Sequence, residues 1–199
     1  MTSYFQALLL ACAVAAMGSA AAAPVLEINA GLLTGARGVT VEGETYDVKF
    51  LEGTCAAVHG SCANDAFIFT SRTQALHASQ ALLDQVFVDG PLGAFDADLN
   101  LTTGCSGRAS CLLFTASMVP RGEWIEAGAI YNLAAPAPSG YNILSWYFLR
   151  LDMDTATSDN TIWAVWSKAA AEVPEPGSVA LFGLTLAAMG TRLRRRRKA

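Results

Sequence analysis

The sequence predicts an α+β fold for the central body of this chain, mostly an antiparallel β-sheet with one clear helix. Short runs rich in β-branched and aromatic residues outnumber helical patterns, and turn-forming residues separate them. One longer segment has the periodicity of an amphipathic helix. With 199 residues, 53% of them apolar and 15% charged, the chain can bury a sizeable core and is not intrinsically disordered. Apolar segments at the two ends predict, in addition, an N-terminal signal peptide and a C-terminal single transmembrane helix.

The signal peptide is expected over residues 1–23, which carry no charged side chain. Residues 7–17 are an apolar block, and small residues follow it, as signal peptidase requires. Cleavage after Ala20 or Ala22 is favoured over cleavage at residue 23, because Pro24 would follow that bond. A short buried helix and a lipoprotein-like site at Cys12 are the alternatives.

The exported body is expected over residues 24–172 and begins with a β-hairpin. Residues 38–41 and 45–51 are β-forming runs joined by a turn at 42–44. In the second run every other side chain is apolar, which predicts one buried face; these residues are Tyr46, Val48 and Phe50.

A short apolar strand is expected at residues 67–70 and the helix at residues 72–88. Ser71 can cap the start of this helix, and an Asp-Gly-Pro sequence follows its end. The apolar positions near helical spacing are Leu76, Leu82, Leu83, Val86 and Phe87. A loop rich in Pro and Ala separates the later strands, which are expected at residues 111–119, 141–151 and 161–167.

Four cysteines remain once the signal peptide is removed, and they form two local pairs in the sequence. Four cysteines allow three disulfide pairings. We favour Cys55 with Cys62 and Cys105 with Cys111, because each pair closes a short loop that contains turn formers. Structural zinc is the alternative, with His59 as a further ligand, but its ligands usually lie two to four residues apart. An oxidising compartment outside the cytoplasm preserves such disulfides.

Charge is distributed very unevenly along the chain. Residues 24–173 contain 16 acidic and 7 basic side chains, whereas the segment from residue 174 onward contains one acidic and six basic side chains. The acidic body argues against nucleic acid as a partner. Bases confined to the end of an apolar stretch are typical of membrane topology.

Candidate catalytic and metal-binding residues in the body are few, and we assign no catalytic residue, metal site or cofactor. Both histidines, His59 and His77, are expected to be solvated. Asp96, Asp98 and Asn100 imitate the start of a calcium-binding loop, but the later positions do not fit, so a turn with solvated acids is favoured.

Two further groups of residues have a structural and a functional interpretation. Asp152 and Asp154 would share one face of a strand, where they could act as an acid–base pair or simply face solvent. Trp146, Trp163 and Trp166 could stack on sugars, but Trp163 and Trp166 would point to opposite faces of a strand. Core packing is therefore expected for at least two of the three tryptophans.

The C-terminal segment, residues 173–199, has three parts in fixed order. Val173, Pro174, Glu175 and Pro176 form an extended peptide, because proline cannot join a helix interior. An apolar segment over residues 178–193 follows, and its 13-residue helical centre would reach only about 20 Å across a hydrocarbon core of about 30 Å. The third part anchors its end in the cytoplasm by the positive-inside rule, and its basic residues are Arg192, Arg194, Arg195, Arg196, Arg197 and Lys198.

This order of motif, apolar segment and arginine cluster resembles the PEP-CTERM sorting signal of exported bacterial proteins. The resemblance implies that Val173, Pro174, Glu175 and Pro176 are recognised by an exosortase, a membrane protease with its own catalytic cysteine. It also implies that the anchor is discarded and that the body reaches the cell surface or extracellular matrix. Proteins with this signal are linked to exopolysaccharide and biofilm.

The body also resembles those of other proteins that carry the signal, at residues 46–50, 53–55 and 78–84. That likeness implies no activity. The sequence therefore predicts a non-enzymatic surface or matrix protein, first anchored in the inner membrane, whose partners are the exosortase, that membrane and exopolysaccharide. An exported hydrolase of polysaccharide or peptide, and a binding module that keeps its anchor in the periplasm, are the alternatives.

Overall fold

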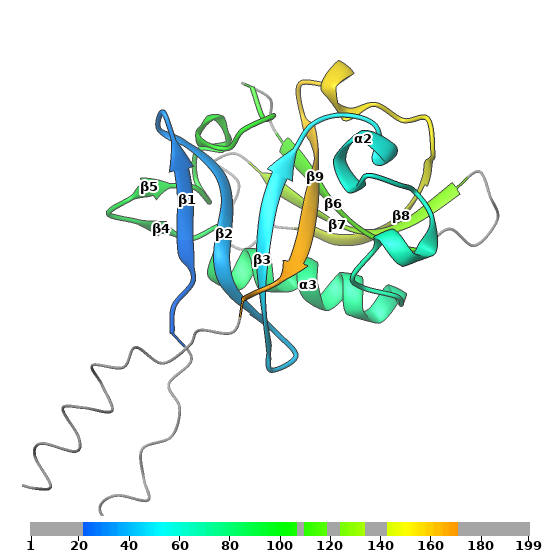
Figure 1. Cartoon of the computed structure of the whole chain (residues 1–199). Helices are drawn as coiled ribbons and strands as arrows, with labels where there is room; N and C mark the ends of the chain where they lie inside the picture. Colours follow the sequence, from blue (N-terminus) through cyan, green and yellow to red (C-terminus); the bar gives the residue numbers. More distant parts are fainter. Residues whose placement is uncertain (1–21, 107–109, 119–123, 134–142, 171–199) are drawn as a thin grey trace, which may run out of the picture. The chain divides into compact units, whose positions relative to one another are not determined.

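The computed structural model describes residues 22–106, 110–118, 124–133 and 143–170. Seven strands of this part form one sheet in the order β1-β2-β3-β9-β6-β7-β8 (Figure 1). Neighbouring strands are antiparallel, except that β6 and β9 run parallel. The expected α+β class is thus confirmed for the body. Residues 1–21 of the expected signal peptide and the whole expected transmembrane segment lie outside the described residues.

The first three strands form two successive hairpins: β1 (Val25–Asn29), β2 (Leu32–Val41) and β3 (Glu44–Leu51). The turn between β2 and β3 consists of Glu42 and Gly43, whose φ angles of 51° and 86° match the twist of the flanking strands. The predicted hairpin is therefore confirmed. Its turn is one residue shorter than expected, and β1 and the first half of β2 were not predicted.

The long helix of the described residues is α3 (Arg72–Gln85), and the short α2 (Cys55–His59) precedes it. The Ser71 hydroxyl accepts a hydrogen bond from the Gln74 amide at 3.3 Å, as the predicted cap requires. The helix ends three residues earlier than expected, because the Phe87 amide turns back to the Leu82 carbonyl at 2.8 Å. Within the described part of the chain, no helix has the length and apolar character needed to cross a bilayer.

The apolar segment over residues 67–70 is not a strand, contrary to expectation. Phe67 packs in the hydrophobic cluster on one side of the sheet, whereas Phe69 packs in the cluster on the other side. The segment thus passes from one face of the sheet to the other. Its apolar character reflects burial during this crossing and not strand pairing.

The second half of the body supplies the other strands of the sheet. The 3₁₀ turns Leu99–Leu101 (η2) and Thr155–Thr157 (η3) and a small hairpin of β4 (Asp89–Gly90) and β5 (Gly93–Ala94) connect the larger elements. The large strands here are β6 (Ser110–Met118), β7 (Trp124–Leu133), β8 (Ile143–Arg150) and β9 (Thr161–Lys168). All but β7 correspond to predicted strands.

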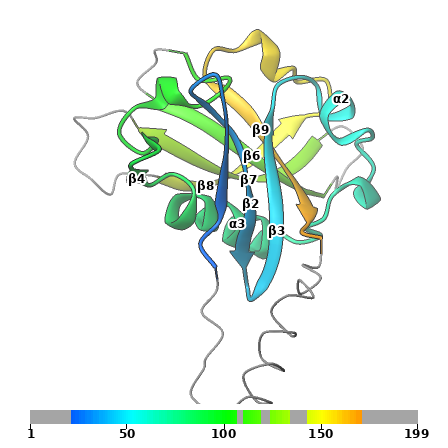
Figure 2. The same cartoon turned by 60° about the vertical axis from the view of Figure 1, so that its left-hand side comes forward.

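The central strands of the sheet are buried on both faces, and α3 lies against one of these faces (Figure 2). Along β6, Cys111 and Leu113 enter the cluster beneath α3, whereas Leu112 and Phe114 enter the opposite cluster beneath α2 and the 3₁₀ turn η1 (Asn64–Ala66). A strand with two buried faces carries few polar side chains, and the buried run from Cys111 to Phe114 in β6 is wholly apolar. Central strands β6 and β9 thus join the two halves of the core.

Candidate functional site

The residues that the sequence assigns to sorting lie outside the described part of the chain. These are Val173, Pro174, Glu175 and Pro176, together with Arg192, Arg194, Arg195, Arg196, Arg197 and Lys198. The chain divides into two compact units, Met1–Ala169 and Ala170–Ala199. The described structure shows where this segment begins, at the end of β9.

The point at which the chain leaves the sheet is fixed at the end of β9. The Ala169 amide donates to the Thr45 carbonyl at 3.1 Å, which continues the pairing with β3 by one residue. Lys168 Nζ lies 2.6 Å from Glu44 Oε2 and 4.8 Å from the centre of the Tyr46 ring. The hydrogen bond between Lys168 and Glu44 raises the pKa of the lysine and lowers the pKa of the carboxyl group. Both stay charged near neutral pH and tie the last strand to the β2–β3 turn.

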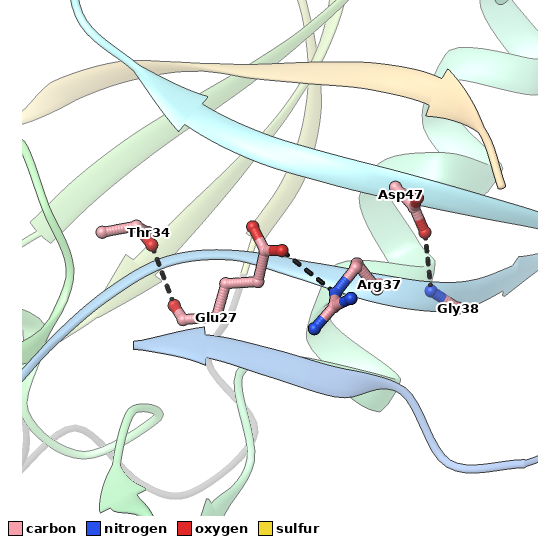
Figure 3. A network of polar contacts seen from close by, with 5 residues as sticks. All are labelled: Glu27, Thr34, Arg37, Gly38 and Asp47. Carbon is pink, nitrogen blue, oxygen red and sulfur yellow. Dashed lines mark hydrogen bonds and ion pairs between the residues drawn. The ribbon is translucent and has the colours of Figure 1, made fainter. Parts of the chain in front are cut away.

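The first strand is held to its neighbour by polar contacts across β1 and β2 (Figure 3). Arg37 Nε lies 3.1 Å from Glu27 Oε1, and the Thr34 hydroxyl donates to the Glu27 carbonyl at 3.0 Å. The register of β2 with β3 shifts here, and the Gly38 amide donates to Asp47 Oδ1 at 3.0 Å. Asp47 thus satisfies an amide that the shift takes out of the ladder.

The two ends of the described body lie at the same end of the sheet. Val25 pairs with Arg37 on β2, Val39 pairs with Tyr46 on β3, and Tyr46 pairs with Lys168 on β9. Three strand spacings of about 4.8 Å put the two ends roughly 14 Å apart. The segments that precede and follow the body therefore leave it from neighbouring positions.

The structure joins the cysteines in the favoured pairs. Cys55 is bonded to Cys62 and Cys105 to Cys111, with Cα separations of 5.8 and 5.7 Å. The zinc alternative is therefore wrong, because these sulfurs are not available as metal ligands. The first disulfide ties α2 to the segment that covers Trp163.

His59 is not solvated, contrary to expectation. It is the last residue of α2, and its ring packs edge-on against Phe67 and Trp163 at centroid distances of 5.1 and 5.7 Å. Burial lowers the pKa of His59 to about 4. Its Nε2 atom is buried and finds no hydrogen-bond partner among the described residues. His59 is thus a neutral packing residue at neutral pH.

The other histidine and the acidic loop behave as expected. His77 is exposed on α3 with Nδ1 2.6 Å from Glu42 Oε1. Asp98 caps η2 by accepting a hydrogen bond from the Asn100 amide at 3.0 Å. Among the described residues, no group of three potential ligands could hold a metal ion.

Asp152 and Asp154 do not share a strand face, which corrects the expectation. Both lie in the connection between β8 and η3, where Asp154 caps η3 through the Ala156 amide at 3.0 Å. Asp152 accepts two hydrogen bonds from Arg150, at 2.9 and 3.0 Å. These bonds lower the pKa of Asp152, whereas a general acid needs a raised pKa. The geometry therefore does not favour Asp152 as the acid of a hydrolase.

The tryptophans divide between core and surface. Trp163 and Trp166 are buried on opposite faces of β9, as predicted, and Trp166 Nε1 donates to the Thr115 hydroxyl at 3.2 Å. Trp146 is half-buried on β8, with the Arg72 guanidinium 4.6 Å from its ring centre. Core packing is thus confirmed for two of the three.

An aromatic patch on β7 and β8 is the principal surface feature that sequence reasoning missed. We define it as Trp124, Glu126, Trp146, Phe148 and Arg150, which lie on one face in cross-strand register. Trp124 and Phe148 are 39% and 54% exposed, and Arg150 lies 6.0 Å from the Trp124 ring centre. Residues 146–149 are all apolar or aromatic, so no alternation in the sequence indicates which face of β8 is exposed.

Comparison with known families identifies the C-terminal segment. The family description of the PEP-CTERM protein-sorting motif matches residues 172–197. Curated proteins and solved structures yield no match to the chain. The match covers the motif, the apolar segment and the arginine cluster that the sequence singles out. The chain therefore carries a C-terminal PEP-CTERM sorting motif, which implies export, a membrane-anchored precursor and processing by an exosortase.

Proposed function

We propose that this chain is a non-enzymatic structural protein of the cell surface or extracellular matrix, released from its anchor by an exosortase. The main support for this proposal is the sorting motif at residues 172–197. The motif begins three residues after Ala169, whose amide makes the last described hydrogen bond between β9 and β3. The protease would thus cut a peptide just outside the folded body. Two disulfides in the body agree with an oxidising destination.

Each part of the segment has a separate role in this proposal. Val173, Pro174, Glu175 and Pro176 are recognition residues, extended by the two prolines and therefore accessible to an enzyme cleft. The apolar segment holds the precursor in the inner membrane. The basic cluster from Arg192 to Lys198 keeps the far end in the cytoplasm until the protease has acted.

Cell fractionation with intact-mass measurement tests this function. The wild-type protein should lose the residues after the motif and leave the membrane. The P174A/E175A/P176A variant should keep its arginine cluster and stay with the membrane, whereas A170S, outside the matched residues, should behave as wild type. A wild-type protein that keeps its tail in the membrane would favour the permanently anchored binding module. An uncut, reduced chain in the cytoplasm would overturn export itself.

We further propose the aromatic patch as the surface through which the body contacts exopolysaccharide. Phe148 offers an exposed ring face, and the side chains of Trp124 and Arg150 on the same face are also exposed to solvent. Exposed rings with neighbouring polar groups are suited to stacking on sugars and bonding to their hydroxyls.

Affinity electrophoresis through gels that contain the exopolysaccharide of the producing cells tests this contact. Wild-type mobility should fall as the polymer content rises, and F148A should lose most of that retardation. The variant L92A removes an apolar side chain outside the patch that is 65% exposed. This variant should be retarded as much as the wild type. Equal retardation of all three proteins would contradict the assignment.

A further inference from the structure

The connection at η2 contains an acceptor sequence for asparagine-linked glycosylation. Of the six asparagines in the chain, Asn100 is the one with a serine or threonine two residues later, at Thr102. The pattern Asn-x-Ser/Thr, where x is not proline, is the acceptor of N-glycosylation in exported proteins. Asp98 stands two residues before Asn100. An acidic residue at that position belongs to the longer acceptor pattern of bacterial oligosaccharyltransferases.

We propose that Asn100 carries an N-linked glycan, and that it is attached before the body folds. The proposal rests on the export implied by the proposed function. The glycan donor would be an oligosaccharide linked to a lipid pyrophosphate. The enzyme would be an oligosaccharyltransferase in the membrane that the chain crosses.

The folded structure can accommodate the modified side chain. Asn100 is exposed on η2, and its Nδ2 atom donates to Asp98 Oδ1 at 3.0 Å. An amide nitrogen joined to a sugar keeps one of its two hydrogens, so this hydrogen bond can persist after modification. Because Asn100 is exposed, a glycan attached there would project into solvent.

Thr102, in contrast, is hidden in the folded body. Its exposed fraction is 2%, it forms a β-bridge with Leu33, and its amide donates to the Leu99 carbonyl at 3.0 Å. Leu99, inside the same pattern, belongs to the core. An oligosaccharyltransferase must reach the threonine hydroxyl as well as the asparagine. Modification must therefore precede formation of these contacts.

The Thr102 hydroxyl also has no evident role in the folded state. Its Oγ1 atom is buried and lacks a hydrogen-bond partner among the described residues. A buried hydroxyl without a partner destabilises a folded protein, and valine has nearly the same shape without the hydroxyl. If the hydroxyl is needed before folding, as part of the acceptor sequence, the presence of threonine at position 102 is explained.

The transfer balances without any redox step. The Asn100 Nδ2 atom attacks the anomeric carbon of the donor sugar, and a nitrogen–carbon bond forms as the carbon–oxygen bond to phosphate breaks. The lipid pyrophosphate leaves with the bonding electron pair, and the proton lost from Nδ2 passes to a base of the transferase. Products are the glycosylated chain and the free lipid pyrophosphate.

Intact-mass measurement of the exported protein tests the site. The wild-type protein should show the mass of one glycan in addition to its chain. N100Q and T102V should lose it, and T102S should keep it. The control N64Q, an exposed asparagine without the pattern, should also keep it. T102V removes a hydroxyl without a described partner, so it should fold at least as stably as wild type in a urea titration.

Transfer in vitro tests the order of events independently of export. A purified bacterial oligosaccharyltransferase with its lipid-linked oligosaccharide is mixed with the full chain, either folded and oxidised or freshly diluted from urea and reductant. The unfolded chain should be glycosylated at least tenfold faster. Equal rates would overturn the proposed order, and no transfer to either form would overturn the site. An exported wild-type chain with a processed tail and no glycan would overturn the modification while leaving the proposed function intact.

Discussion

At the scale of single residues, His59 combines apolar surroundings with an ionisable ring. Its edge-on packing between Phe67 and Trp163 suits a neutral imidazole and leaves Nε2 without a described partner. A protonated ring there would place a charge in the cluster beneath α2. The unfolded chain therefore binds a proton at His59 more readily than the folded chain does.

Acid should destabilise the body through this residue. With the folded pKa at about 4 and the ordinary value at 6.5, the contribution of His59 is complete above pH 6.5. It is lost as the pH falls toward 4, by about 2 kcal/mol, and levels off below that pH. Urea titrations at a series of pH values should show this loss for wild type and a flatter profile for H59F between pH 4 and 6.5.

The variant H77Q is the matched control for H59F. It removes the other imidazole, which is exposed on α3, and should still lose stability between pH 6.5 and 4, because His59 is unchanged. A profile unchanged in H59F would show that other groups cause the acid sensitivity.

At the scale of elements, α3 packs closely against β7. Gly128 lies on β7 beneath the first turns of α3, and a Cβ added there would meet the Ala75 carbonyl oxygen at 2.8 Å. The helix face is correspondingly made of small residues, since Ala75, Ala78 and Ser79 are all fully buried. Glycine at position 128 thus lets a helix backbone approach a strand.

The substitution G128A should therefore destabilise the body. Backbone atoms of Ala75 cannot rotate away as a side chain would, so the helix must shift, at a cost of about 1–3 kcal/mol. The measurement is the urea midpoint, compared with that of G90A, which adds a methyl group where nothing lies within 4 Å. Similar midpoints for G128A and wild type would contradict the close approach of α3 to β7.

The sequence predicts the elements that are determined by nearby residues, and it misses those that depend on contacts with distant residues. The β2–β3 hairpin is predicted because Gly43 and the alternation of β3 are visible in a short window. Strand β7 is missed because Gly128 weakens its β-pattern, and the helix that requires this glycine is distant in the sequence. The turn before β2 is missed because Ala30, with a φ of 50°, is an unusual residue for such a turn.

The same distinction applies to the candidate site. The sorting motif and the cysteine pairs are linear patterns, and sequence reasoning identified both before any fold was known. The surroundings of His59 and the partners of Asp152 depend on the tertiary fold. The sequence alone predicts a solvated His59 and an Asp152 on a strand face, and both predictions are wrong.

At the scale of the whole molecule, β9 joins the two halves of the sheet. It pairs antiparallel with β3 through residues 163–168 and parallel with β6 through residues 161–163. Its side chains enter both clusters, with Ile162 in one and Trp163 in the other. The last strand in the sequence is thus central in the sheet.

Truncations on either side of β9 should have opposite effects. A fragment of residues 22–170 retains every described strand and should unfold cooperatively in urea, with a midpoint near that of the full chain. A fragment of residues 22–159 lacks β9, leaves β3 and β6 without a shared neighbour and should show no cooperative transition. Far-ultraviolet circular dichroism follows both, and cooperative unfolding of the shorter fragment would contradict the central role of β9.

The position of β9 also determines when the body can fold during export. A polypeptide that is threaded through a translocon amino end first delivers β9 after every other strand of the body. The seven-stranded sheet cannot form until β9 has arrived. Enzymes that act on unfolded polypeptides therefore have access to the chain during most of its translocation. The sheet can therefore be completed only when β9 has crossed, immediately before the residues of the sorting motif follow.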